Sequence, residues 1–127
     1  MTKTALEMTR QEWTAYSSGV AKHKILDPLS VQKQRKEAMR LANHAAELLR
    51  KEYSAKKVIL FGTLAMDTGF SEHSDIDLAA YGIPDALFYR AAARVSGLSP
   101  EFTVDLVDPD SCRPSVRESI LTRGIEL

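Results

Sequence analysis

Three aspartates in two short apolar stretches could do chemistry together. Asp75 and Asp77 are one residue apart in the stretch Asp75–Tyr81, and Asp105 lies inside a second stretch, Phe102–Val107. Side chains alternate between the two faces of a strand, so Asp75 and Asp77 share one face of the first stretch. If the apolar side chains of both stretches pack under helices, Asp105 joins that face. The pattern therefore predicts three carboxylates that converge on one sheet surface.

Three neighbouring carboxylates repel one another, and a hard divalent cation is the simple remedy. Oxygen ligands favour Mg²⁺ or Mn²⁺, and a pair of such ions can hold the attacking and leaving oxygens of a phosphoryl transfer. We therefore expect Asp75, Asp77 and Asp105 to bind Mg²⁺ (or Mn²⁺), with a two-ion site favoured. The alternative is that these are solvated acids on the exposed face of a half-buried sheet, and an Asp-x-Asp pair alone favours that interpretation.

The dipeptide Gly62-Thr63 directly follows the apolar run Lys57–Phe61. A glycine there lets the backbone approach a ligand, the turn can present N–H groups to phosphate oxygens, and the Thr63 hydroxyl adds a donor. The alternative is an ordinary turn glycine. Neither G-x-x-x-x-G-K-[ST] nor G-x-G-x-x-G occurs, so a phosphate site here requires another fold.

The elements that must position these residues can be read from capping signals and periodicity. Asp27-Pro28 begins a helix, and the apolar face that follows recurs at helical spacing. The expected order is a helix to about Tyr53, strands at 57–61 and 75–81, a helix at 84–96, a strand at 102–107, a helix at 114–123 and a tail at 125–127. A hairpin-like pair followed by a helical crossover predicts an α+β fold, a small mixed β-sheet backed by helices on one face.

Residues 1–26 are predicted to form an N-terminal arm and residues 27–127 the domain proper. Leu6, Trp13, Tyr16 and Val20 fall at spacings that place them on one face of a helical arm. The arm either folds back on its own domain or docks its aromatic residues on another chain.

The composition of the chain limits which binding partners and which cellular location are expected. The chain has 127 residues, enough for one domain, and its 17 basic residues balance its 17 acidic residues. This neutrality predicts no direct DNA binding and no membrane binding, and it does little to oppose association, so a homodimer stays open. Cys112 is the single cysteine, and no apolar signal core or membrane-length run occurs. We expect a reducing, cytoplasmic location.

Taken together, these motifs resemble the minimal nucleotidyltransferases of the DNA polymerase beta superfamily, of the MNT antitoxin type. Gly62 and Thr63 match the family's Gly-Ser, and Ser74, Asp75 and Asp77 match its Ser-Asp-x-Asp. The later strand Val-Asp-Leu-Val carries the third acid, Asp105, and the ending SILTRGIEL resembles the family's closing helix and tail.

The resemblance implies transfer of a nucleoside monophosphate from an NTP, ATP favoured, to a hydroxyl acceptor. It implies catalytic and metal-binding roles for Asp75, Asp77 and Asp105, with Asp105 also assisting the acceptor as a base. Gly62, Thr63 and Ser74 would bind the nucleotide phosphates. Many small members resemble antitoxins that modify a HEPN-type toxin partner with AMP, which makes a protein acceptor a hypothesis.

The sequence departs from the family pattern directly after Gly62-Thr63. Many members have Arg-Ala-Arg-Gly there, whereas this chain has Leu64-Ala65-Met66-Asp67. Arginine is the natural bidentate partner of phosphate, and an acid would repel it. His73 is a candidate replacement donor, although a loop histidine is more often a surface residue. A catalytically weakened relative that acts as a binding or antitoxin partner is therefore the alternative to an active transferase.

Overall fold

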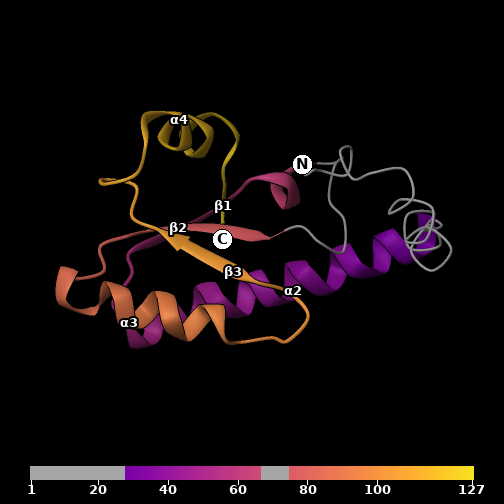
Figure 1. The fold of residues 1–127 in the computed structure, drawn as a ribbon, viewed down its shortest axis with the longest axis horizontal. Coiled ribbons are helices and arrows are strands. Elements are labelled where there is room, and N and C mark those ends of the chain that lie inside the picture. The colour runs from indigo at the N-terminus through magenta and orange to yellow at the C-terminus, as the bar shows by residue number, and fades with distance from the viewer. Residues whose placement is uncertain (1–27, 67–74) are drawn as a thin grey trace, which may run out of the picture. The chain divides into compact units, whose positions relative to one another are not determined.

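The computed structural model of the chain describes residues 28–66 and 75–127 (Figure 1). The chain separates into two compact units, residues 1–31 and 32–127, and nearly all of the described elements lie in the second. In chain order the elements are α2 (Pro28–Glu52), β1 (Lys57–Phe61), the short 3-10 helix η1 (Thr63–Ala65), β2 (Ile76–Tyr81), α3 (Asp85–Ser96), β3 (Val104–Val107), α4 (Pro114–Arg123) and β4 (Ile125–Glu126). The predicted order of elements is confirmed.

The four described strands form one mixed sheet in the order β3-β2-β1-β4. β1 and β2 pair antiparallel, with Phe61 opposite Asp77. The chain then crosses through α3 and returns as β3, which runs parallel to β2. A parallel neighbour requires such a crossover, because a tight turn can only join antiparallel strands. The predicted hairpin-like pair and helical crossover are both present.

The larger core lies where α2 and α3 pack on one face of the sheet. The sheet contributes the residues that alternate toward this face, among them Val58, Leu60, Ile76, Leu78 and Val104. Helix α2 meets them largely with small side chains: Ala38, Ala42, Ala45 and Ala46 are fully buried. Alanine lets a helix backbone approach the sheet closely and costs almost no side-chain entropy. This packing fixes which strand residues point inward.

The opposite face of the sheet carries a smaller cluster under α4. Ile120 of α4 packs with Ile59, Phe61 and Ala79, and Val116 borders them. The α+β fold class is confirmed, and α2 and α3 do back one face of the sheet. Helix α4 lies on the other face, because the outward residues of β1 are themselves apolar and need cover.

The tail of the chain forms a strand that the sequence patterns did not indicate. Ile125 pairs with Leu60 and Glu126 with Ile59, and the N–H of Leu127 donates to the Val58 carbonyl at 2.9 Å. A two-residue strand is too short to produce an alternating pattern, and only its neighbour β1 makes it one.

The predicted N-terminal arm, with Trp13 and Tyr16, lies outside the described residues, as does the capping residue Asp27. Within the ranges 28–66 and 75–127, no helix is long and apolar enough to cross a membrane.

Gly124, at the end of α4, is predicted to be intolerant of a side chain. A Cβ there would collide with the Ile59 side chain and the Ile120 carbonyl oxygen, and both are held in place by the sheet and the helix. Gly124→Ala should therefore lower the free energy of unfolding by about 1–3 kcal/mol, as overpacking does, which urea denaturation would measure.

The matched control is Gly97→Ala at the end of α3. A Cβ at Gly97 would come no closer than 3.7 Å, to the Ala93 carbonyl oxygen. This variant should leave stability unchanged or raise it by up to about 1 kcal/mol. Equal losses in both variants would contradict the collision argument.

Candidate functional site

Asp77 and Asp105 lie side by side on neighbouring parallel strands. They are register partners, Asp77 in β2 and Asp105 in β3, and adjacent strands are about 4.8 Å apart. The residues flanking Asp77, Ile76 and Leu78, are fully buried in the core, so both carboxylates point to the opposite face. The alternation expected from the sequence is confirmed.

Asp75 completes the group at the start of β2. The N–H of Ile76 donates to the Thr103 carbonyl at 2.9 Å, which ties this end of β2 to β3. Asp75 is exposed, yet its carboxyl group interacts with that of Asp105 through both charge and a hydrogen bond. The structure therefore brings the three predicted acids together.

Crowding shows in the electrostatics of these carboxyl groups. Burial raises the pKa of Asp77 from an ordinary 3.8 to about 6, and the charges of Asp105 and Asp75 push it the same way. Loss of solvent also raises the pKa of Asp105, followed by the charge of Asp75 and the hydrogen bond with it. In every case the neighbours disfavour the charged form. Carboxylates whose charged forms are disfavoured in this way are suited to a cation, which would stabilise those forms.

Gly62 provides space beside Asp77. A Cβ on Gly62 would collide with the Asp77 carboxylate, and its φ of 81° lies in the left-handed region that other residues avoid. Thr63 and the two residues after it form η1, in which the N–H groups of Ala65 and Met66 bond back to Gly62 and Thr63. The glycine is therefore more than a turn residue, because it sets the distance between the backbone and the acid.

A cation from α2 lies at this turn, and sequence reasoning missed it. The Arg35 Nη1 donates to the Met66 carbonyl at 2.7 Å. The sequence patterns assign Arg35 no part in the site, and the residue is half-buried. The two partners are 31 positions apart in the sequence, and a contact over that separation leaves no periodic signal that could have revealed it. The turn that lacks arginines of its own has one from another element.

Ser74 is the remaining predicted site residue. Ser74, together with Asp67 and His73, lies outside the described residues. Among the residues that are described, no group of three or more His, Cys, Asp or Glu side chains has the arrangement of a ready metal cage. Mg²⁺ often binds one or two protein carboxylates, with phosphate oxygens and waters completing its shell. The oxygen donors of Asp77 and Asp105 fit that mode of binding.

Comparison with known proteins places this arrangement in a known fold. No model of a protein family matches the chain, and no curated protein matches it either. Eleven chains of solved structures do match. One is from a toxin–antitoxin with AMP-PNP, with 25% identity and a TM-score of 0.53 over 67% of this chain and 70% of that one.

Two further solved structures are also similar to this chain. A mutant MntA-HpeT toxin–antitoxin shows 26% identity and a TM-score of 0.52, covering 67% of this chain and 69% of that chain. The third contains a tri-AMPylated Shewanella oneidensis HEPN toxin in complex with an MNT antitoxin, with 22% identity, a TM-score of 0.50 and 70% of each chain covered. The chain has the minimal nucleotidyltransferase fold of the MNT type.

Burial of Asp77, together with the charges of Asp105 and Asp75, should make this residue's contribution to the stability of the cation-free protein smaller at neutral pH than in acid. Asp77 binds its proton more tightly when folded, so its contribution is fully present below pH 3.8 and is lost as the pH rises through about 6. Removing the charge by Asp77→Asn should therefore raise the free energy of unfolding at pH 8 by about 1–3 kcal/mol. At pH 5, which lies between these two pKa values, about half of that gain should remain. Thermal unfolding in EDTA at both pH values would measure it.

Asp110→Asn is the control, because it removes one negative charge from an exposed position outside the carboxylate group. It should change stability by less than about 0.5 kcal/mol at either pH. A stabilisation by Asp77→Asn that does not depend on pH would contradict the proposed origin of the repulsion.

Proposed function

From this fold and this group of acids, we propose that the chain is a metal-dependent nucleotidyltransferase. It transfers a nucleoside monophosphate from an NTP to a hydroxyl group of a protein partner, and AMP is the favoured group. The observation that carries the proposal is the pairing of Asp77 with Asp105 beside Gly62, where a side chain would collide with the acid. A sheet without a ligand has no use for three mutually repelling acids at this place.

Each of the site residues would have a separate role in the reaction. Asp77, Asp105 and Asp75 would hold divalent cations, which supply neutralisation of the triphosphate charge. The η1 turn would present its backbone and the Thr63 hydroxyl to phosphate oxygens. The acceptor oxygen forms a bond to the α-phosphorus, the bond from that phosphorus to the bridging oxygen breaks, and pyrophosphate leaves. The acceptor proton passes to Asp105.

Asp105 suits the role of base because of its position. It is exposed, and β3 is the edge strand of the described sheet. A hydroxyl on another protein could therefore reach Asp105 from outside, whereas Asp77 lies one strand further in. A protein acceptor is supported by the solved complex of an MNT antitoxin with a tri-AMPylated HEPN toxin, and we propose a HEPN-type partner for this chain.

The runner-up function is a catalytically weakened antitoxin that binds its partner without modifying it. One observation favours it: Leu64, the residue after Thr63, is fully buried, and the described part of the turn carries no basic side chain of its own. The position of Arg35 favours the active transferase instead, since Arg35 brings a guanidinium to the same turn.

Nucleotide binding and transfer should both depend on Asp77. Mn²⁺ with ATP should raise the melting temperature, because a ligand that binds only the folded state stabilises it by mass action. Asp77→Asn should abolish the shift, whereas Asp110→Asn should keep it.

A second experiment tests transfer. Radiolabelled NTPs would be offered to the protein together with the product of the neighbouring gene. Label on that product, lost with Asp77→Asn, is the expected result.

Two outcomes would separate the candidate functions. No thermal shift with any NTP and metal at millimolar concentration would contradict the transferase. Tight binding of the partner without label transfer would favour the weakened antitoxin.

Arg35 should hold the turn for the nucleotide. Arg35→Ala removes the donor to the Met66 carbonyl, so the turn loosens and the thermal shift with Mn²⁺ and ATP should fall to less than half. Arg50→Ala is a matched control: it removes an arginine of the same helix that donates to the Leu127 carbonyl at 3.1 Å. This variant can lose stability, but its nucleotide shift should remain. Equal losses of the shift would show that Arg35 acts only through general stability.

A further inference from the structure

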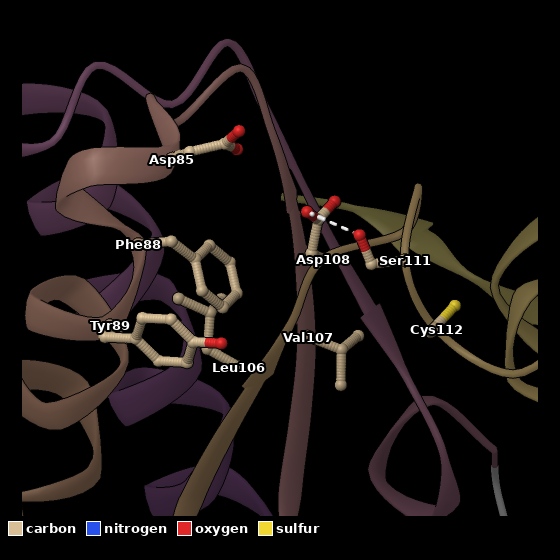
Figure 2. A pocket seen from close by; sticks show the side chains of 8 residues that line it. All are labelled: Asp85, Phe88, Tyr89, Leu106, Val107, Asp108, Ser111 and Cys112. Atoms are coloured by element: carbon tan, nitrogen blue, oxygen red, sulfur yellow. Dashed lines mark hydrogen bonds between the residues drawn. The ribbon is translucent and has the colours of Figure 1, made fainter.

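A cavity of about 490 Å³, which none of the three acids lines, lies between α3 and the end of β3 (Figure 2). Asp85, Phe88 and Tyr89 line it from α3, Leu106 forms part of it from β3, and Asp108 and Cys112 line it from the loop that follows. Its volume is within the range of small-ligand pockets. None of the residues proposed for nucleotide transfer lines it, so the cavity requires an explanation of its own.

The aromatic wall of the cavity is unusually open. The Phe88 and Tyr89 rings meet edge to face, with centroids 6.1 Å apart and an interplanar angle of 83°. Tyr89 is 85% exposed although it is a large residue of hydrophobic character. Figure 2 shows both rings directed from α3 toward β3. Large exposed aromatic side chains that border a cavity typically mark a place where a ligand or partner binds.

The charge around the cavity has one sign. Asp85 and Asp108 both line it, and no Lys, Arg or His is among the described residues that do so. The Asp108 carboxylate is held in place by the Ser111 hydroxyl at 3.2 Å and by the Asp110 N–H at 2.9 Å. An acid in a fixed position next to an aromatic face suits a planar cation, which can stack on the ring and pair with the carboxylate.

The backbone next to the cavity is suited to an extended segment. β3 is the edge of the described sheet, and in a parallel ladder alternate residues direct their N–H and C=O groups to the same neighbour. Because the Thr103 carbonyl accepts from β2, Val104 and Leu106 direct theirs outward. An extended peptide can therefore pair along this edge, and the side chain that it directs inward at Leu106 would enter the cavity.

We propose that this cavity binds an arginine side chain of an extended segment of a partner protein. The segment pairs with the outer edge of β3, and its guanidinium stacks on Tyr89 between Asp85 and Asp108. The proposal is independent of nucleotide transfer, because the cavity and the three acids share no residue. The charge complementarity selects a basic side chain, and the outer edge of β3, which no other described strand covers, selects a peptide over a free small cation.

The test uses the full chain and two matched peptides. The probes are acetyl-Thr-Val-Arg-Val-Thr-amide and the same peptide with citrulline, which keeps the shape of arginine and removes its charge. Calorimetric titration should show at least ten-fold weaker binding of the citrulline peptide. The arginine peptide should also bind at least ten-fold more tightly than N-acetyl-arginine methylamide, because only the peptide can pair with β3.

The location is tested with Cys112, the single cysteine of the chain. Its alkylation by iodoacetamide should slow at least five-fold when the arginine peptide is bound, since Cys112 lines the cavity. Tyr89→Ala and Asp85→Asn should each weaken the peptide at least five-fold. Both replaced side chains are exposed, so the variants should fold. Asp110→Asn, outside the cavity, should bind as the original chain does.

Four outcomes would overturn the proposal. Equal affinity for the arginine and citrulline peptides would show that the positive charge of arginine does not contribute to binding. Equal affinity for the peptide and the arginine amide would point to a small organic cation instead of a protein segment. Unchanged alkylation of Cys112, or unchanged binding to the Tyr89→Ala and Asp85→Asn variants, would place the peptide elsewhere.

Discussion

The parallel pairing of β2 with β3 is the interaction on which the rest of the structure depends. It sets Asp77 opposite Asp105, and it exists only because α3 carries the chain back across the sheet. A slip of one residue in β2 would turn every side chain of that strand to the other face, which would bury Asp77 and expose Ile76 and Leu78. The apolar residues on the core face therefore determine the position of the acids on the opposite one.

This arrangement costs stability, and the fold offsets the cost elsewhere. Burial and neighbouring charge raise the pKa values of Asp77 and Asp105, so the cation-free site is electrostatically unfavourable at neutral pH. The opposite face is apolar and closely packed, with fully buried alanines of α2 against the strands. A stable core on one face thus permits repelling acids on the other, where a ligand relieves the repulsion.

The edge strand β3 contributes residues both to the group of acids and to the cavity. Asp105 lies near its start on the face of the acids, and Leu106 lines the cavity beside Tyr89. Strand edges are a liability in most proteins because they can pair with other chains. Here the outer edge of β3 in the described sheet is part of the proposed docking site, so a partner bound along it would pass close to Asp105.

By itself the sequence determined the order of elements, the alternation of strands and the shared face of Asp75, Asp77 and Asp105, since these follow from local periodicity and capping. Gly62 was singled out by its place after a strand, but only the structure shows what it avoids, the carboxylate of Asp77. The position of α4 over Ile59 and Phe61, the strand at Ile125, and the contact of Arg35 with Met66 were decided by tertiary structure alone. Each joins residues distant in sequence, and pairs of this kind leave no periodic pattern along the chain.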